Sequence, residues 1–201
     1  MPRETVKIYD TTLRDGLRNS GITMTLEQKL AFARQLEALN VDAIEIGYGG
    51  PSQIETMKQL AQAVTQPVVY GLSRVNIKDV ERVLESVGRA KKPGVNIFHP
   101  VSDDFLHRAK RTRQQAIDNT TKAIAYARQH VGHVVFATQD ASRADPGFLV
   151  EICNAVTAAG ATAISIADSV SYAVPEQFGK LCEFIRTSTT ESDTVTCWRA
   201  S

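Results

Sequence analysis

The chain has 201 residues and a formal net charge of +1, with 23 lysines and arginines against 22 aspartates and glutamates. This length is typical of one domain with a substantial core, so we expect residues 1–201 to form a single domain. The interspersed charges create no field that would gather nucleic acid or anionic lipid, which excludes both as expected partners. The three cysteines are odd in number and show no CxxC spacing, which fits a reducing cytoplasm. No apolar leader begins the chain and no apolar run approaches bilayer length, so we expect no membrane partner.

Short apolar runs rich in β-branched residues alternate with longer amphipathic stretches along the chain. The predicted strands are VKIY from Val6, DAIEIG from Asp42, VVYGL from Val68, GVNIF from Gly94, HVVFAT from His133 and TAISIAD from Thr162. This alternation predicts βα units. Since the strands are almost continuously apolar, we expect a parallel sheet that is covered on both faces or closed into a barrel.

The predicted helices carry recognisable start signals. The first begins after Thr25, which forms a capping box with Gln28, and ends at Leu39, with Leu36 and Leu39 on its apolar face. Later helices are predicted at residues 52–63, 77–86, 111–130, 146–159 and 175–186. The last two begin with proline, which suits the first position of a helix.

Polar residues recur directly after several predicted strands, and they distinguish between the two parallel architectures. These residues are Asp10 and Asp15, Arg74, Ser102 and Asp103, Gln139 and Asp140, and Asp168 and Ser169. Doubly wound sheets usually carry a glycine-rich phosphate turn after the first strand, whereas DTTLRDG lacks GxGxxG. Side chains gathered from many strand ends are typical of the C-terminal face of a β/α barrel. We therefore predict an α/β fold of the (β/α)8 TIM-barrel type.

The predicted barrel is incomplete. About six βα units are followed by a possible seventh strand around Val195, whereas a complete eight-unit barrel needs about 250 residues. Residues 187–201 have little of the earlier pattern and form an atypical tail. The pattern leaves open a fragment, a truncated product, or a chain that obtains its remaining wall from a partner.

The segment TLRDG places Arg14 beside Asp15 after the first predicted strand. A carboxylate can hold a divalent cation, and a guanidinium can neutralise an oxyanion that forms nearby. Side by side, the two suit enolate chemistry. The structural alternative is that Asp10 and Asp15 cap a βα turn and that Arg14 pairs with one of them.

The run YDTTLRDG resembles the signature of the metal-dependent superfamily that includes 2-isopropylmalate, homocitrate and citramalate synthases and the hydroxymethylglutaryl-CoA lyases. Four later blocks resemble the isopropylmalate synthase barrel in the right order: GLSRV, SDDFLHRAKRTRQQA, QDASRADPGFL and ADSVSYAVPEQFGKL. The similarity covers Val6 to about Arg186. It implies an acyltransferase of leucine biosynthesis that condenses acetyl-CoA with a metal-bound 2-oxo acid, and it implies a homodimer.

The resemblance assigns roles to named residues. Arg14 would stabilise an enol or enolate, and Asp15 would be a ligand of Mg, Mn or Zn. Ser169 stands where a threonine hydroxyl contacts the 2-oxo acid's carboxylate, and Arg74 matches a basic residue near that carboxylate. His107 lies in a block that borders the acyl donor. For Arg74 and His107, a helix-capping cation and a solvated histidine are equally open interpretations.

Other positions depart from the family's pattern. Where RDGEQ is common, the chain has Leu17 and Arg18, so Arg18 takes a place beside the substrate and substrate selection must differ. Gln139 replaces a glutamate that takes part in proton handling, and an amide cannot act as a general base. Ser171 replaces a glycine, a change that matters if φ is positive there.

The expected metal site is also incomplete. The family's further ligands include a His-x-His pair on the seventh strand, and no His-x-His occurs in the sequence. Because specific sites need several ligands at fixed geometry, Asp15 alone would hold a divalent ion poorly. We therefore expect impaired catalysis. Two alternatives stay open: a catalytically inactive fragment or binding protein, and a carbon–carbon lyase on related machinery.

Overall fold

The computed structural model describes residues 6–18, 21–190 and 195–198. The chain contacts group into two compact units. The first comprises Met1–Ser73, Lys78–Val95 and Val131–His133, and the second comprises Arg74–Ile77, Asn96–His130 and Val134–Ser201.

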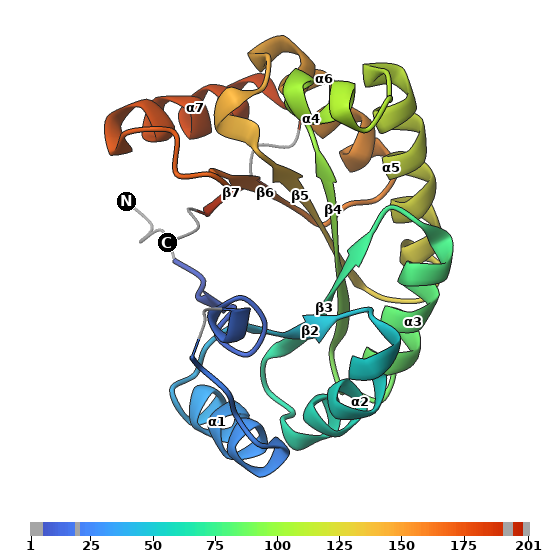
Figure 1. Cartoon of the computed structure of the whole chain (residues 1–201), viewed down its shortest axis with the longest axis vertical. Helices are drawn as coiled ribbons and strands as arrows, with labels where there is room; N and C mark the ends of the chain where they lie inside the picture. The colour runs from blue at the N-terminus through green and yellow to red at the C-terminus, as the bar shows by residue number, and fades with distance from the viewer. Residues whose placement is uncertain (1–5, 19–20, 191–194, 199–201) are drawn as a thin grey trace. The chain divides into compact units, whose positions relative to one another are not determined.

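The first unit contains parallel strands with helices packed against them. The elements that lie mainly in it are β1 (Tyr9–Asp10), η1 (Gly16–Arg18), α1 (Leu26–Ala38), β2 (Ala43–Tyr48), η2 (Pro51–Gln53), α2 (Ile54–Ala63), β3 (Val68–Arg74) and α3 (Ile77–Val87). Strand β2 pairs in parallel with β1 and with β3. Helices α1 and α2 lie side by side, and α2 packs on β2 (Figure 1).

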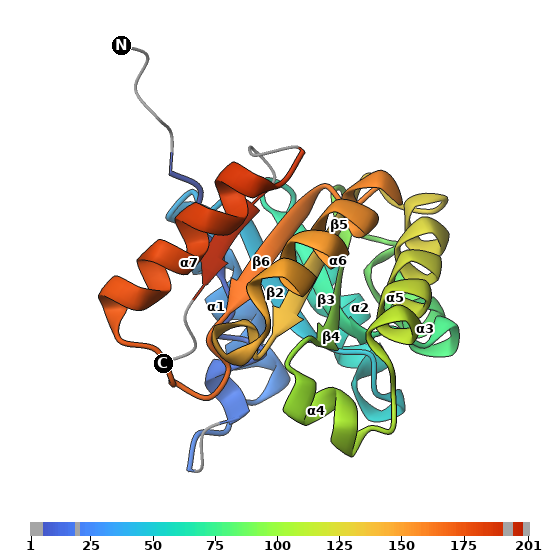
Figure 2. The ribbon, with the colours of Figure 1, turned by 90° about the horizontal axis from the view of Figure 1, so that it is seen from above.

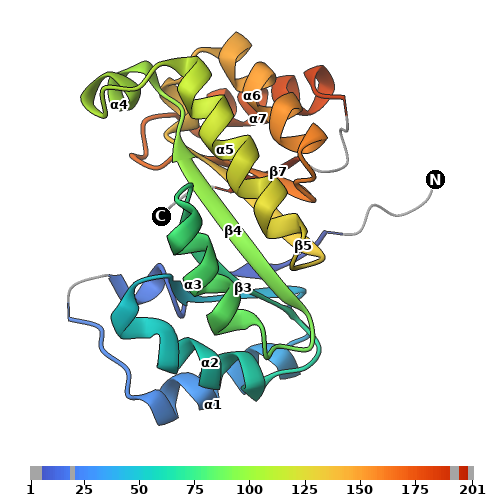
Figure 3. The ribbon, with the colours of Figure 1, turned by 90° about the vertical axis from the view of Figure 1, so that its right-hand side faces the viewer.

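The second unit repeats this arrangement. After β4 (Pro93–Pro100), which begins in the first unit, its elements are α4 (Asp103–Arg108), α5 (Arg113–Arg128), β5 (His133–Gln139), η3 (Ala141–Arg143), α6 (Pro146–Ala158), β6 (Ala163–Ala167), α7 (Pro175–Ser188) and β7 (Val195–Trp198). Strand β6 pairs in parallel with β5 and β7. Helices α6 and α7 are neighbours (Figure 2), and α4 follows the end of β4 (Figure 3).

The described elements confirm most of the predicted pattern. Sheet order follows chain order from β1 to β7, and each of the first six strands is followed by a helix. The six βα units are therefore present, and the seventh strand lies where it was predicted. Within the predicted atypical tail, α7 extends to Ser188 and β7 begins at Val195, while residues 191–194 and 199–201 lie outside the described part.

Two local predictions were wrong, and one short helix was missed. The first strand begins at Tyr9 and not at Val6, whose side chain is 81% exposed. Helix α1 has the predicted capping box but ends at Ala38, so Leu39 becomes its C-cap and is 74% exposed. The short helix α4 was not predicted, because six residues are too few for apolar periodicity to show, although Ser102 caps its start.

Burial on both faces of the strands explains why their sequences are almost continuously apolar. Residues 43–47 of β2 and residues 94–97 of β4 are all buried, on both faces of the strand. Both sets of alternating side chains are therefore removed from water, as in a parallel sheet. Among the described helices, none is long and apolar enough to cross a membrane.

The close packing of β3 on its helices makes a testable prediction. A Cβ at Gly71 would lie 2.6 Å from Cγ1 of Val83 and 2.8 Å from Cε of Met57. We expect Gly71→Ala to lower the free energy of unfolding by about 1–3 kcal/mol, because the added methyl overpacks the core. Gly179 in α7 has no atom within 4 Å of an added Cβ, so Gly179→Ala should instead raise stability by about 0.5–1 kcal/mol. Equal stabilities in urea titrations would contradict this packing.

Candidate active site

A tight turn after β1 presents the Arg14–Asp15 pair. The backbone N–H groups of residues 14–16 all point at the carbonyl oxygen of Thr11, at N–O distances of 3.0, 2.7 and 3.3 Å. Asp10 accepts hydrogen bonds from the backbone N–H of Thr12 at 2.9 Å and from its hydroxyl at 3.1 Å. Asp10 therefore caps the turn, as the structural alternative expected, and the turn backbone fixes where the next two side chains begin.

Arg14 is held by a buried carboxylate from the neighbouring strand. Its side chain is only 10% exposed, and its Nε and Nη2 atoms both contact Oε2 of Glu45, which is fully buried on β2. Nη1 of Arg14 donates to Oδ1 of Asp15 at 2.6 Å. Because a buried charge requires a partner and good geometry, Glu45 fixes the plane of the guanidinium.

Sequence reasoning missed Glu45. The available signal was a single acidic residue within the apolar run DAIEIG. A charge in a strand that is buried on both faces needs a counter-charge, and Glu45 lies 31 residues from the arginine that provides it. Such a partner cannot be read from local spacing.

Two tyrosines complete the surroundings of Glu45. The hydroxyl of Tyr9 donates to Oε1 of Glu45 at 2.9 Å. The Tyr9 ring stands edge-on to the ring of Tyr70, with centroids 5.3 Å apart and an interplanar angle of 88°. Tyr70 is buried on β3, and this burial raises its pKa to about 12.

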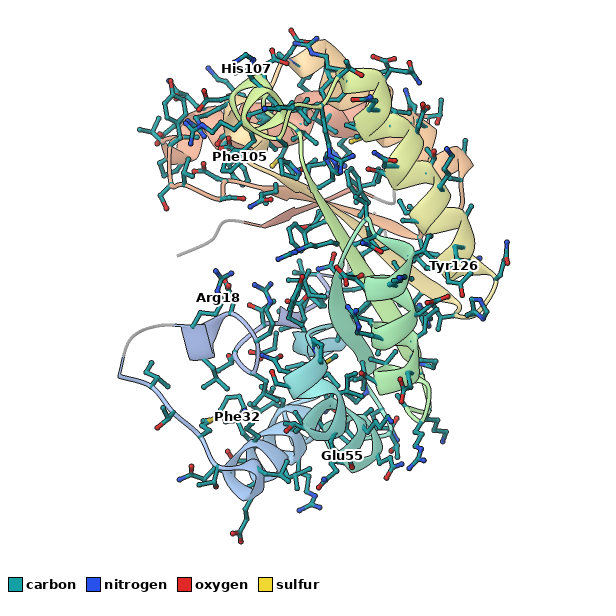
Figure 4. All side chains as sticks on the ribbon, turned by 45° about the vertical axis from the view of Figure 1, so that its right-hand side comes forward. Arg18, Phe32, Glu55, Phe105, His107 and Tyr126 are labelled. Carbon is teal, nitrogen blue, oxygen red and sulfur yellow. The ribbon has the colours of Figure 1, made fainter. Side chains whose placement is uncertain are left out.

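Arg18 forms a longer and more exposed ion pair with Asp15. Its Nη1 lies 3.8 Å from Oδ1 of Asp15, and its side chain is 74% exposed on η1 (Figure 4). An exposed ion pair at this distance is weak. Arg18 is therefore available to an anion in solution, while Asp15, at 31% exposure, is oriented mainly by Arg14.

The second unit builds its own polar cluster around Asp140. This carboxylate is fully buried and accepts from the Ser102 hydroxyl at 2.5 Å and from Nη2 of Arg143 at 2.6 Å. Its residue adopts a left-handed conformation with φ of 65°. In this conformation its backbone N–H donates to Oγ of Ser169 at 3.0 Å. The end of β5 is thus joined to the turn after β6.

The other predicted site residues of the second unit are Gln139, Arg74 and His107. Gln139 is half-buried at the end of β5, and its carbonyl oxygen accepts from the N–H of Val101 at 3.0 Å. Arg74 is exposed at the end of β3. His107 is exposed on α4, where it projects away from Phe105 (Figure 4). The structure therefore places Gln139 next to Asp140 in the chain and Ser169 in hydrogen-bond contact with it, and it leaves His107 on the helix surface.

The turn after β6 is anchored by Asp168. Its Oδ1 accepts from the Ser142 hydroxyl at 2.5 Å and from the N–H of Tyr172 at 3.0 Å, and its Oδ2 accepts from the N–H of Ala173 at 3.1 Å. Ser171 within this turn has φ of 51°. The condition under which a serine in place of glycine matters is therefore met, because a left-handed non-glycine residue is strained by about 1–2 kcal/mol.

The residues described here do not fit a complete metal site. Within the described ranges, no three or more His, Cys, Asp or Glu side chains are grouped so that they could hold a metal ion. Asp15 offers one carboxylate, and its Oδ1 is already bound by Arg14. A divalent cation needs several oxygen or nitrogen ligands at fixed geometry, so Asp15 would be a single donor.

Comparison with known proteins identifies the family of the chain and proteins that are similar to it. The HMGL-like family model matches residues 5–198. The chain belongs to the HMGL-like family. Similar curated proteins are the 2-isopropylmalate synthase B of Solanum pennellii, 41% identical over 197 residues, and the 2-isopropylmalate synthase of Pyrococcus furiosus, 34% identical over 196 residues. These alignments cover 92% and 95% of this chain but only 32% and 39% of the relatives, so the chain spans about a third of their length.

Solved structures show the fold. The HMG-CoA lyase of Bacillus subtilis is similar with a TM-score of 0.77 at 17% identity, over 98% of this chain and 69% of that one. An HMG-CoA lyase of Acinetobacter baumannii, in complex with coenzyme A and 3-methylmalate, is similar with a TM-score of 0.73 at 17% identity, over 95% and 65%. The predicted class, an incomplete barrel of the TIM type, is confirmed, as is the family resemblance.

Because the Glu45–Arg14 pair is buried, we expect the charge of Glu45 to matter for stability. Glu45→Gln keeps the shape of the side chain but removes its charge. We expect it to lower the free energy of unfolding by about 3 kcal/mol at neutral pH, because Arg14 loses its main counter-charge away from water. Glu85→Gln is the matched control, since Glu85 is 58% exposed in its pair with Lys58 and should matter by less than about 1 kcal/mol. Equal losses in urea titrations would show that burial is unimportant here.

The buried phenol of Tyr70 predicts a loss of stability in alkali. Its pKa is raised from 10.0 to about 12 by burial, so the folded state holds this proton more tightly than the unfolded chain. The stabilisation is complete below pH 10 and is lost as the pH rises through 12. One pKa unit corresponds to about 1.4 kcal/mol, so the total loss is about 3 kcal/mol. Unfolding titrations of wild type and Tyr70→Phe across this window should diverge; parallel curves would exclude Tyr70 as the cause.

Proposed function

We propose that this chain carries the acyl-transfer machinery of a 2-isopropylmalate synthase: the acetyl-CoA methyl carbon loses a proton and bonds to the carbonyl carbon of a 2-oxo acid, and water then hydrolyses the thioester to release coenzyme A as the free thiol. The observation that carries the proposal is the Arg14–Asp15 pair, anchored by Glu45 at the end of β1. Relatives named 2-isopropylmalate synthase at 34–41% identity support it. By the same resemblance we propose leucine biosynthesis as the setting, the cytoplasm as the location and a homodimer as the assembly.

Arg14 is proposed to act on developing negative charge. Deprotonation of the acetyl-CoA methyl group produces an enolate, and a fixed guanidinium beside its oxygen stabilises that charge. Removing one preorganised donor of this kind typically lowers the rate by about 10²–10³-fold. Because Glu45 holds Arg14 before any substrate arrives, little reorganisation accompanies the reaction.

Ser169 is proposed to recognise the carboxylate of the 2-oxo acid. Its Oγ already accepts the N–H of Asp140, so the hydroxyl proton is available as a donor from an exposed side chain. Arg74 and Arg18 are each exposed cations that suit an anionic group of a substrate, and we propose His107 as a contact of the acyl donor. Asp15 is proposed as a metal donor.

Gln139 is the reason we propose impaired catalysis. It occupies the position next to Asp140 where the family has a glutamate, and a neutral amide cannot accept a proton in this step. A second candidate function follows from the same observation. With an amide at this position and an incomplete metal site, the chain would bind its ligands without turning them over. A lyase is favoured less, because the similar lyase structures are only 17% identical and show the fold alone.

Thiol release from acetyl-CoA tests the proposal. With pyruvate, 3-methyl-2-oxobutanoate or 2-oxoglutarate, and with Mg, Mn or Zn added, we expect little or no release by the wild-type chain. Gln139→Glu should raise the rate at least about tenfold by restoring a proton acceptor, and adding Arg14→Ala should abolish the gain.

Each outcome of this assay is informative. Robust wild-type turnover that is lost in Asp15→Ala would overturn the impairment and strengthen the assignment as an acyltransferase. If Gln139→Glu stays inactive while calorimetry detects acetyl-CoA and oxo-acid binding that depends on Arg14, the ligand-binding function is supported. Absence of both binding and turnover would contradict the assignment as an acyltransferase.

A further inference from the structure

We infer that Tyr9 is a positioning residue that sets the orientation of Arg14 through Glu45, with Tyr70 and Gly94 holding Tyr9 in place. This inference rests on the proposed function, because it names what orients the arginine of that site. The contacts that carry it all lie within the first unit.

The two oxygens of Glu45 have different partners. Oε2 receives Arg14, and Oε1 receives the Tyr9 hydroxyl at 2.9 Å. A carboxylate held at one oxygen only can rotate about its last bond, whereas one held at both oxygens cannot do so without breaking a hydrogen bond. Tyr9 therefore locks the angle at which Glu45 meets the guanidinium of Arg14. Arg14 in turn passes this orientation to Asp15 through Nη1.

Tyr9 is itself seated by an aromatic contact. Its ring meets Tyr70 edge-to-face at a centroid distance of 5.3 Å, a favourable geometry for two aromatic rings. Tyr70 has room for its ring only because residue 94 is glycine: a Cβ there would lie 2.5 Å from Cε1 of Tyr70. Gly94 on β4 thus creates the space, Tyr70 on β3 fills it, and Tyr9 on β1 rests against Tyr70.

The four residues lie on four strands of the sheet. Tyr9, Glu45, Tyr70 and Gly94 belong to β1, β2, β3 and β4. Side chains fixed by neighbouring strands hold a site more closely than side chains on loops. Arg14 lies on the turn after β1, whose backbone fixes where its side chain begins, and the strand network fixes the guanidinium at the other end of that side chain.

Hydrogen exchange of the Arg14 side chain tests the inference without any substrate. In ¹⁵N-labelled full-length chain, the Nε–H of Arg14 is shielded by its bond to Glu45. Tyr9→Phe removes one oxygen and keeps the ring, so Glu45 loses the hydrogen bond that fixes its Oε1. We expect the Nε–H exchange rate of Arg14 to rise about tenfold. Tyr172→Phe, the same change at a side chain that is 66% exposed, should leave the rate unaltered.

A double substitution separates positioning from a general loss of stability. In a Glu45→Leu background no oxygen remains at residue 45 to connect Tyr9 with Arg14, so adding Tyr9→Phe should change the Arg14 exchange rate no further. A purely structural role would accelerate exchange in both backgrounds equally, and that result overturns the inference. Tyr70→Leu, which removes the support of Tyr9 but not its hydroxyl, should give a smaller increase than Tyr9→Phe; no increase in either variant also overturns it.

The two hypotheses fail in different ways. If acetyl-CoA turnover and binding are absent but the exchange rate responds as described, the proposed function fails and the positioning network stands. If Gln139→Glu gains activity while Tyr9→Phe leaves both the exchange rate and the turnover number unchanged, the proposed function stands and Tyr9 is not a positioning residue.

Discussion

The buried ion pair between Glu45 and Arg14 is the interaction on which the candidate site depends. Two charges withdrawn from water are tolerated only when geometry and further hydrogen bonds compensate their lost hydration. Here the compensation comes from the Tyr9 hydroxyl on one side and from Asp15 on the other. The same hydrogen bonds that compensate the burial of the Glu45–Arg14 pair also fix the orientation of Arg14 and Asp15. The stability of the first unit and the geometry of the site therefore depend on the same contacts.

Local sequence signals predicted the frame of the molecule well. Thr25 with Gln28 forms the predicted capping box, and prolines at positions 146 and 175 begin α6 and α7 as predicted. These signals succeed because capping and the missing N–H of proline act within one turn of helix. The end of α1 was predicted one residue late, since the apolar spacing continues to Leu39 although the helix does not.

The candidate site was less accessible to sequence reasoning. Arg14 and Asp15 were named from their residue types and their place after the first strand, and Ser169 was named through the family resemblance; the roles of all three are proposals. Glu45 was not named, because its importance arises from a partner on another strand and not from its neighbours in the chain. The left-handed conformation of Ser171 was raised as a condition that only the structure could decide. Long-range pairing and backbone torsion are tertiary properties, and a single sequence carries little record of them.

The bond from the Asp140 N–H to Ser169 has a chemical consequence of its own. A main-chain amide does not titrate, so the polarity it imposes on the serine is the same in acid and in alkali. A histidine or lysine in that place would stop donating once it lost a proton. The Ser169 hydroxyl would therefore stay a hydrogen-bond donor to a ligand at every pH at which the protein is folded. Any pH dependence of ligand binding must come from another, titratable group.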